Sequence, residues 1–520
     1  MAAPRRILFV VSECLPFAKA GGLGDVASAL SKALVDRGHD ARVLLPLYGS
    51  IDRARFAIEP MSPLCVHMGR GEEVWAGLSR ATLDDAVPVY FLDYGRFYDR
   101  PGIYNEAWEY ADNPQRFALL SKSALQIGID LDWVPDVVHV HDWPTSLAAA
   151  YVKHLEPRHA ALAHTASVLT IHNVQYQGKF PADSLPYLGL PPSVFDPDHL
   201  EDFGGINLLK CGIAFADKIT TVSPTHAREM LEPVGGHGLA PYLARRVADT
   251  VGILNGVDEE VWNPARDPLL PVRFSADAMR GKLECKRMLQ ARFGLDPRPD
   301  VPLFGIVARF APQKGLDLLR DALPPLLRGT AMQLVVLGSG DASLEGFFRS
   351  LVESHPRSVA ATFGYSEELA HLIEAGADFF LMPSLYEPCG LNQMYSMRYG
   401  TLPLVRATGG LADTVADYDA ASGRGTGFVF RDPTPAALAD AIGRAVRTWY
   451  GKPSHVARMR RDGMARRFSW EESARRYEEV YERAIEARRG APRRPAARRA
   501  PEPSRGGGTI GIRGDSLRGF

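Results

Sequence analysis

Short apolar runs alternate with helical patterns along most of the chain. Runs such as 7–11, 136–140 and 167–171 are nearly continuous in Val, Ile and other apolar residues, which is typical of parallel strands covered on both faces. After the first run, Val26, Leu30 and Leu34 recur at helical spacing. The alternation of strand and helix predicts an α/β protein built from βαβ units.

The pattern forms two series, which predicts two Rossmann-like, doubly wound parallel sheets. At 520 residues the chain also exceeds what one core usually supports. A proline-rich segment at 262–268 suits a hinge between the two series. The sequence does not decide whether residues 56–132 form an insertion near a site or a surface region. The strands are expected at 7–11, 41–45, 87–92, 136–140, 167–171, 218–222 and 252–254, and then at 303–308, 333–337, 359–363, 377–382 and 401–405.

Composition and charge narrow the class of protein. The formal net charge is −1, which gives no electrostatic reason to expect nucleic acid or membrane as a main partner. The five cysteines contain no CxxC pair, and no run of about 20 apolar residues could span a bilayer. We therefore expect a cytoplasmic protein with reduced thiols. The Arg-, Pro- and Gly-rich segment 488–520 is expected to be a disordered tail.

A glycine-rich loop, KAGGLGD from Lys19 to Asp25, lies between the first strand and the first helix. Glycines at a helix start let phosphate oxygens approach backbone amides, and Lys19 adds a positive charge. The loop is neither GxGxxG nor a P-loop, and the second strand ends without an acid that could hold a nucleotide ribose. A nicotinamide site is therefore disfavoured. Tight packing of helix on strand is an alternative reason for the glycines.

Polar residues follow three other strands of the first series. Asp142 follows the run 136–140, while His172 and Asn173 follow the run 167–171. The carboxyl ends of strands in an open α/β sheet are where ligands bind. A lone histidine is more often a packing residue, but two polar clusters at one sheet edge favour function. Asn255 lies in an Asn-Gly turn, which is either a simple turn or part of the site.

The second series offers backbone amides and cations. The turn Glu387–Leu391 precedes a helical pattern, so its last amides are unpaired donors at a helix start. Thr408–Gly410 would form a second amide cluster. Arg309 and Lys314 bracket one strand-to-helix loop, where two fixed cations could stabilise a departing diphosphate in place of a metal. The alternative interpretation is that Arg309 and Lys314 are solvated surface charges without a ligand.

Together these motifs resemble the bacterial glycogen synthase and plant starch synthase family of ADP-glucose-dependent glycosyltransferases. KAGGLGDV (with Ala20 in place of the usual threonine), HDW, TIHN, NGVD, R-x4-K, EPCGL, TGGLADTV and FSW occur in the family's order. The E-x7-E motif of related glycosyltransferases is absent, because Tyr395 stands eight residues after Glu387. That departure agrees with the glycogen synthase branch.

The resemblance implies the GT-B fold, with two Rossmann-like domains facing a deep interdomain cleft. The expected boundaries are 1–263 and 264–465, with a helix at 466–487 that crosses back to the first domain. The implied reaction is retaining transfer of glucose from ADP-glucose to the non-reducing 4-hydroxyl of an α-1,4-glucan such as glycogen. It implies no cofactor and no metal, and a monomer or small homo-oligomer. The residues alone do not show whether the enzyme prefers ADP-glucose or UDP-glucose as the donor.

By the same resemblance, the site residues fall into two groups. Those expected to be catalytic are His172, Asp142, Arg309, Lys314 and Glu387. Those expected to bind substrate are Lys19, Gly21, Gly22, Asp25, Asn173, Asn255, Tyr365, Cys389, Gly390, Leu391, Thr408, Gly409 and Gly410.

A non-catalytic glucan-binding protein is the remaining alternative. Such a protein could keep the cleft but would have no need of phosphate-binding charges. Lys19, Arg309 and Lys314 are all present, which favours an enzyme.

Overall fold

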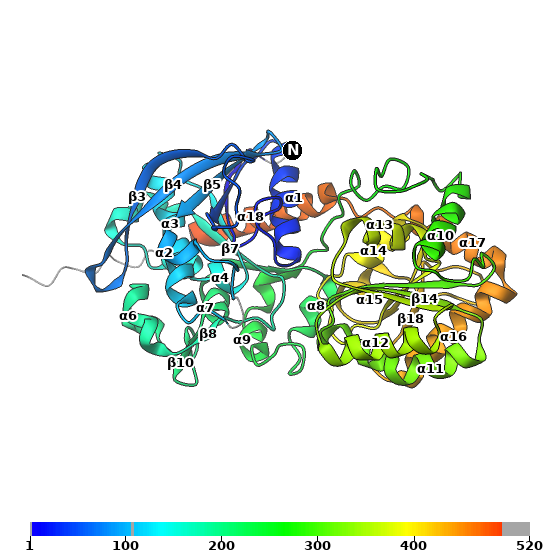
Figure 1. Ribbon diagram of the computed structural model, residues 1–520. Helices are drawn as coiled ribbons and strands as arrows, with labels where there is room; N and C mark the ends of the chain where they lie inside the picture. Colours follow the sequence, from blue (N-terminus) through cyan, green and yellow to red (C-terminus); the bar gives the residue numbers. More distant parts are fainter. Residues whose placement is uncertain (1–2, 106–108, 491–520) are drawn as a thin grey trace, which may run out of the picture.

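Two α/β domains lie side by side in the computed structural model, which describes residues 3–105 and 109–490 (Figure 1). Each domain is built on a sheet of mainly parallel strands with helices packed around it. The predicted fold class is confirmed. Within the described ranges, no helix has both the length and the apolar character needed to cross a membrane.

The first sheet is parallel through most of its width. Its central strands are the predicted apolar runs, buried as expected apart from the exposed Arg6 at the start of β1. Beyond β5 the pairing becomes antiparallel, so part of the segment left undecided by the sequence extends this sheet. The strand order is β12 (Thr250–Gly252), β11 (Lys218–Thr221), β7 (Ala166–Ile171), β6 (Val137–His141), β1 (Arg6–Val10), β2 (Asp40–Pro46), β5 (Val87–Asp93), β4 (Glu73–Leu83) and β3 (Glu59–His67).

Helices and one small sheet complete the first domain. The first helix begins at the glycine-rich loop and buries the predicted Val26, Leu30 and Leu34. The small sheet has the order β8 (Lys179–Phe180), β10 (Gly205–Asn207), β9 (Glu201–Asp202). The helices are α1 (Gly22–Asp36), α2 (Gly95–Tyr98), α3 (Asn113–Asp130), α4 (Asp142–Thr145), α5 (Leu147–Lys153), α6 (Leu185–Leu188), α7 (Leu208–Phe215), α8 (Pro224–Glu229) and α9 (Ala240–Ala244).

The second sheet is parallel in all its pairings. Its order is β15 (Val359–Phe363), β14 (Gln333–Gly338), β13 (Leu303–Val307), β16 (Phe379–Met382), β17 (Leu402–Arg406) and β18 (Phe428–Phe430). The helices are α10 (Arg280–Arg292), α11 (Leu319–Gly329), α12 (Ala342–Ser354), α13 (Glu367–Gly376), α14 (Asn392–Arg398), α15 (Gly409–Thr414), α16 (Pro435–Gly451) and α17 (Pro453–Met464).

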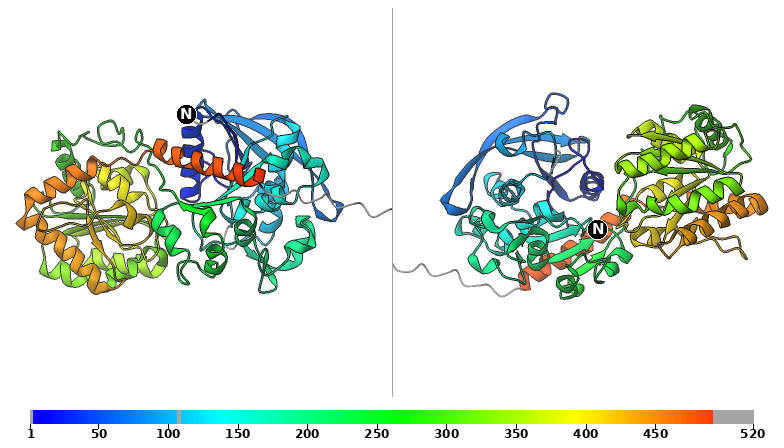
Figure 2. Two further views of the ribbon diagram at one scale, coloured as in Figure 1. Left: turned by 180° about the vertical axis from the view of Figure 1, so that it is seen from behind. Right: turned by 60° about the horizontal axis from the view of Figure 1, so that its bottom comes forward.

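The chain crosses between the domains twice, and its last described helix returns to the first domain (Figure 2). This helix, α18 (Trp470–Gly490), contacts α1 and β7. The two crossing segments meet where the backbone amide of Val257 donates to the carbonyl of Phe468 over 2.7 Å. Tyr481 of α18 is buried and its hydroxyl lies 2.9 Å from Nδ1 of His139 in β6.

Local differences from the sequence prediction occur at element ends. Strand β12 covers residues 250–252, whereas the sequence predicted 252–254; beyond Gly252 the Ile253 amide still donates to the Thr221 carbonyl over 2.8 Å, but the ladder ends there. Helix α18 continues to Gly490, past the predicted start of the tail at 488. Residues 491–520 of the predicted disordered tail lie outside the described residues. The predicted domain boundaries at 263 and 465 stay predictions.

Candidate active site

Three strand ends of the first sheet bring the predicted residues of this domain together. Strands β7, β6 and β1 are parallel neighbours, so their carboxyl ends lie at one edge. The loop after β6 carries Asp142, and the loop after β7 carries His172. The glycine-rich loop follows β1, and α1 lies on the side of the first domain that faces the second (Figure 1).

A pair of stacked histidines and a buried carboxyl form the centre of this edge. His141 Nδ1 and His172 Nε2 are 2.9 Å apart, and the Asp142 carboxylate accepts the backbone amide of His172 over 2.7 Å. Burial lowers the pKa of His172 to about 3, so its imidazole is neutral at pH 7. Burial also raises the pKa of Asp142 to about 7, although amides of His172 and Asn173 oppose that shift.

Glu13, which the sequence analysis did not single out, binds the glycine-rich loop. Its carboxylate accepts the amides of Ala20 and Gly21 over 2.6 and 2.7 Å and the Tyr104 hydroxyl over 2.6 Å. A phosphate at the predicted Gly21 amide would therefore compete with Glu13. The sequence could have indicated Glu13, because this residue lies just beyond β1, at the carboxyl edge of the sheet where ligands bind.

The remaining residues of this loop lie at the start of α1. Lys19 forms an exposed ion pair with Asp25, with Nζ 2.8 Å from Oδ1. Gly22 is the first residue of the helix, and a Cβ added at Gly21 or Gly22 would meet no atom within 4 Å. Open space rather than tight packing therefore surrounds both glycines, which favours the ligand-binding interpretation of the loop.

In the second domain, the predicted lysine and glutamate are in direct contact. Lys314 Nζ lies 2.7 Å from Glu387 Oε2, and Ser384 donates to the same carboxylate over 2.9 Å. Gly315 has a φ of 62° and packs so closely on Pro383 that a Cβ would lie 2.1 Å from its carbonyl. A glycine here thus lets the two loops meet, because β13 and β16 are adjacent.

Arg309 lies at the end of β13, on the same strand-to-helix loop as Lys314. Its side chain is exposed and forms no ion pair within residues 3–105 and 109–490. The guanidinium therefore remains free for an anionic ligand.

The two predicted amide clusters differ in this structure. Across the described ranges, no acceptor is found for the amides of Cys389, Gly390 or Leu391, which precede α14. In contrast, the Gly409 amide and the Thr408 hydroxyl donate to the Glu229 carboxylate of the first domain over 3.0 Å. The Thr408 and Gly410 amides donate to backbone carbonyls. The first cluster is free, as predicted, whereas the second serves contacts within the protein.

The loops of the two domains face one another across their interface. Ser223 of the first domain donates to the carbonyl of Pro388 over 2.6 Å, and the Tyr386 hydroxyl lies 3.2 Å from His226 Nε2. The buried Asn255 donates its backbone amide to the Cys389 thiol, whose pKa burial raises to about 12. The Glu387 turn is therefore held against the first domain.

Tyr365 follows β15 in the second domain. Its side chain is 73% exposed and its hydroxyl donates to Glu367. Partial burial, the contact with Glu367 and, more weakly, the charge of Asp25 raise the pKa of Tyr365. Tyr365 thus presents an exposed aromatic ring that could stack on a base.

Comparison with known proteins identifies the family. The first domain matches the starch synthase catalytic domain over residues 6–245, and the second matches glycosyl transferases group 1 over residues 289–463. A glycogen synthase of Anaeromyxobacter sp. (strain Fw109-5) is 48% identical, covering 91% of this chain and 98% of its own. Glycogen synthase 1 of Geobacter sulfurreducens is 45% identical, covering 93% and 97%. The chain belongs to the glycogen and starch synthase family.

Solved structures of related enzymes have the same two-domain arrangement. The catalytic domain of starch synthase IV from Arabidopsis thaliana, bound to ADP and acarbose, superposes with a TM-score of 0.85 at 33% identity, covering 93% of this chain and all of that one. Sucrose-phosphate synthase from Thermosynechococcus elongatus shares the fold with a TM-score of 0.58 at 17% identity, over the same shares of each chain. The GT-B architecture predicted from the sequence is thereby confirmed.

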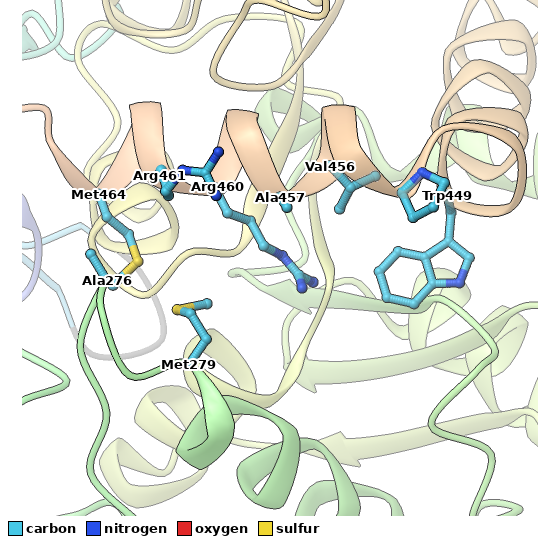
Figure 3. Close-up of a pocket in the computed structure, with 9 residues that line it drawn as sticks. Ala276, Met279, Trp449, Val456, Ala457, Arg460, Arg461 and Met464 are labelled. Carbon is cyan, nitrogen blue, oxygen red and sulfur yellow. The ribbon is translucent and has the colours of Figure 1, made fainter.

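A cavity of about 270 Å³ lies away from the family's site, beneath α17 (Figure 3). Trp449, Met279 and Arg460 are among its lining residues, and none of the predicted site residues lines it. In Figure 3 the Arg460 side chain extends from α17 into the space between Met279 and Trp449, and its guanidinium carbon lies 5.5 Å from the centroid of the Trp449 ring. That guanidinium is engaged by Asp378 over 2.7 Å. The chemistry expected of a glycogen synthase therefore belongs to the domain interface rather than to this cavity.

Proposed function

We propose that this chain transfers glucose from ADP-glucose to the non-reducing 4-hydroxyl of an α-1,4-glucan, with retention, and so elongates glycogen. The observation that carries the proposal is the contact between Lys314 and Glu387 beside three free backbone amides, on a turn that is hydrogen-bonded to the first domain. A cation, a carboxylate and amide donors are the groups that a nucleotide sugar requires at its phosphate and sugar ends.

The phosphate end of the donor would bind at the cations of the second domain. Arg309 and Lys314 place two positive charges at the end of β13, and the amides of Cys389 and Leu391 point from the start of α14. Such preorganised donors stabilise negative charge as it develops on a leaving group. Of the Thr408–Gly410 amides, predicted for the same role, that of Gly409 would have to exchange Glu229 for phosphate, and the other two would have to leave backbone carbonyls.

The sugar end would lie between Glu387 and the first domain. Glu387 accepts hydrogen bonds from sugar hydroxyls, and Asp142 and the neutral His172 line the opposite side. We place the acceptor hydroxyl on the same face as the leaving group. The bond from C1 to the diphosphate oxygen breaks, the bond from C1 to the acceptor O4 forms, and the hydroxyl proton passes to the departing diphosphate. The configuration at C1 is then retained.

We further propose that transfer needs no metal, because Arg309 and Lys314 supply the charge that a divalent cation supplies elsewhere. Activity that survives exhaustive treatment with a chelator would support this, and activity restored only by Mg²⁺ or Mn²⁺ would contradict it. We also propose a cytoplasmic monomer or small homo-oligomer without nucleic-acid or membrane partners. All five cysteines lie in the described ranges and are free thiols, as expected in a reducing compartment.

A glucose-transfer assay on glycogen tests the proposal. The purified chain is given radiolabelled ADP-glucose or UDP-glucose, and label in the precipitated polymer is counted. We expect incorporation from ADP-glucose, with new linkages that α-specific amylases remove. No incorporation from either donor, together with tight glycogen binding, would indicate the non-catalytic glucan-binding alternative. A nicotinamide titration with no binding would exclude the oxidoreductase.

A further inference from the structure

Three metal-ligating side chains gather on the hairpin at the outer edge of the first sheet, far along the strand order from the histidine pair. Strands β3 and β4 form this hairpin (Figure 1). Candidate ligand atoms of Cys65, His67 and Glu73 all lie within 4.8 Å of one another. We propose that they form a reversible binding site for a zinc ion.

The pairing of the strands explains why the three side chains meet. Residues two apart on a strand share one face, so Cys65 and His67 project together while Leu64 and Val66 are buried on the other face. His67 is the cross-strand partner of Glu73, and side chains directly opposite on paired strands are in contact. The backbone of the hairpin therefore fixes the relative positions of all three ligands.

The contacts within the cluster leave ligand capacity unused. His67 Nε2 lies 3.1 Å from Glu73 Oε1, with side chains 31% and 58% exposed. His67 Nδ1 is buried without a hydrogen-bond partner anywhere in the described ranges. The Cys65 thiol is the only one of the five that is not buried. The cluster thus holds an orphaned ring nitrogen and an accessible thiol beside a carboxylate.

The ligand types select the metal. Zinc binds cysteine sulfur, histidine nitrogen and carboxylate oxygen in tetrahedral sites, whereas Mg²⁺ and Ca²⁺ prefer oxygen ligands alone. One thiolate and one carboxylate together carry two negative charges, and a neutral imidazole adds none. The three ligands therefore balance the charge of one divalent ion. With three protein ligands, a water molecule takes the fourth position, so zinc can enter and leave from solvent.

Binding requires that the thiol lose its proton. A cysteine thiol with an ordinary pKa of about 8.5 is mostly protonated at neutral pH. As the bond between zinc and Sγ forms, the bond between Sγ and hydrogen breaks, and the proton goes to solvent. No electron is transferred. The ion would then fasten β3, the edge strand, to β4 and cover the accessible thiol.

Thiol modification tests the site directly on the full chain. Dithionitrobenzoate is expected to react with Cys65 alone in the folded chain, because the other four cysteines are buried. Zinc should suppress this reaction, and removal of zinc with a chelator should restore it. H67A and E73Q should each raise the zinc concentration needed for protection by about 10–100-fold or more. That range is the loss of affinity expected even for a group that only orients a metal ligand. H199A, which alters another surface His–carboxylate pair, should protect like the wild type.

Cobalt supplies an independent readout of the same ligands. Co²⁺ should give a thiolate-to-metal charge-transfer band with the wild-type chain and none with C65S. Circular dichroism verifies that each variant is folded, and glucose transfer should be unchanged in all of them. Equal labelling with and without zinc would overturn the proposal. Protection that persists undiminished in both H67A and E73Q would overturn it too, because the thiol alone would then bind the metal.

Discussion

Lys314 and Glu387 illustrate how two residues distant in sequence become one chemical unit. They lie 73 positions apart, yet adjacent strands place their loops in contact, and Glu387 is only 6% exposed. A largely buried carboxylate needs a partner, and Lys314 supplies it before any donor binds. Removing either residue therefore removes a substrate contact and also leaves the other charge unpaired.

We expect K314A and E387A each to lower the kcat of glucose transfer by about 10²-fold or more, the scale for losing a preorganised transition-state contact. Initial rates at saturating donor measure the effect. K32A is a matched control, since Lys32 pairs with Asp84 in an exposed ion pair of 3.0 Å, and its kcat should equal that of the wild type. Near-normal turnover in both site variants would refute the assignment.

Among the elements, α18 is attached to the first domain by paired charges as well as by apolar packing. Glu478 accepts from Arg37 over 2.6 Å and lies 3.0 Å from His39 Nε2, which is buried. The carboxylate thereby joins α18 to the segment between α1 and β2. These hydrogen bonds are partly shielded from water, unlike the ion pairs on the exposed face of the same helix.

Replacing Glu478 by Gln should destabilise this attachment. A hydrogen bond to a charged group contributes about 1.5–3 kcal/mol, and each kcal/mol lowers the melting temperature of a domain of this size by roughly 2–4 °C. Differential scanning calorimetry measures the shift. E472Q is the control on the same helix, because its pair with Arg475 is exposed on both sides and contributes little. Equal melting temperatures for the two variants would contradict the role of Glu478.

The elements that the sequence predicted well are those whose signal is local. The apolar runs of β6, β7 and β16 and the glycine-rich start of α1 can be read from adjacent residues. The antiparallel extension formed by β3 and β4 depends on pairing between half-buried strands, which local pattern does not specify. Glu13 and Glu229 were missed because their partners lie in other loops or in the other domain.

At the scale of the whole molecule, a buried network anchors the first interdomain connection to the second domain. His371 of α13 lies 2.7 Å from the carboxylate of Asp267 in that connection and 3.3 Å from Glu367. Trp262 stacks on the His371 ring at 3.9 Å and on Tyr395 at 3.8 Å. The connection is therefore held by charge and by aromatic packing at once.

This network predicts a pH dependence of stability. Burial opposes the effect, but Asp267 and Glu367 together raise the pKa of His371 to about 9, compared with about 6.5 in an unfolded chain. The folded state thus favours the protonated ring. Its stabilising contribution is complete below about pH 6.5 and is lost as the pH rises through 9. The melting temperature should fall over that interval, and H371Q should flatten the fall. An unchanged slope in H371Q would contradict the prediction.

The return of α18 has a consequence for how the protein is made. Tyr477, Tyr481 and Ile485 are almost fully buried in the core of the first domain, yet they are translated after the whole second domain. Domains commonly fold one after another as they leave the ribosome. Here the nascent first domain leaves uncovered the apolar surface that α18 later buries, until nearly the last described residue has emerged from the ribosome. The domain that is synthesised first is completed last.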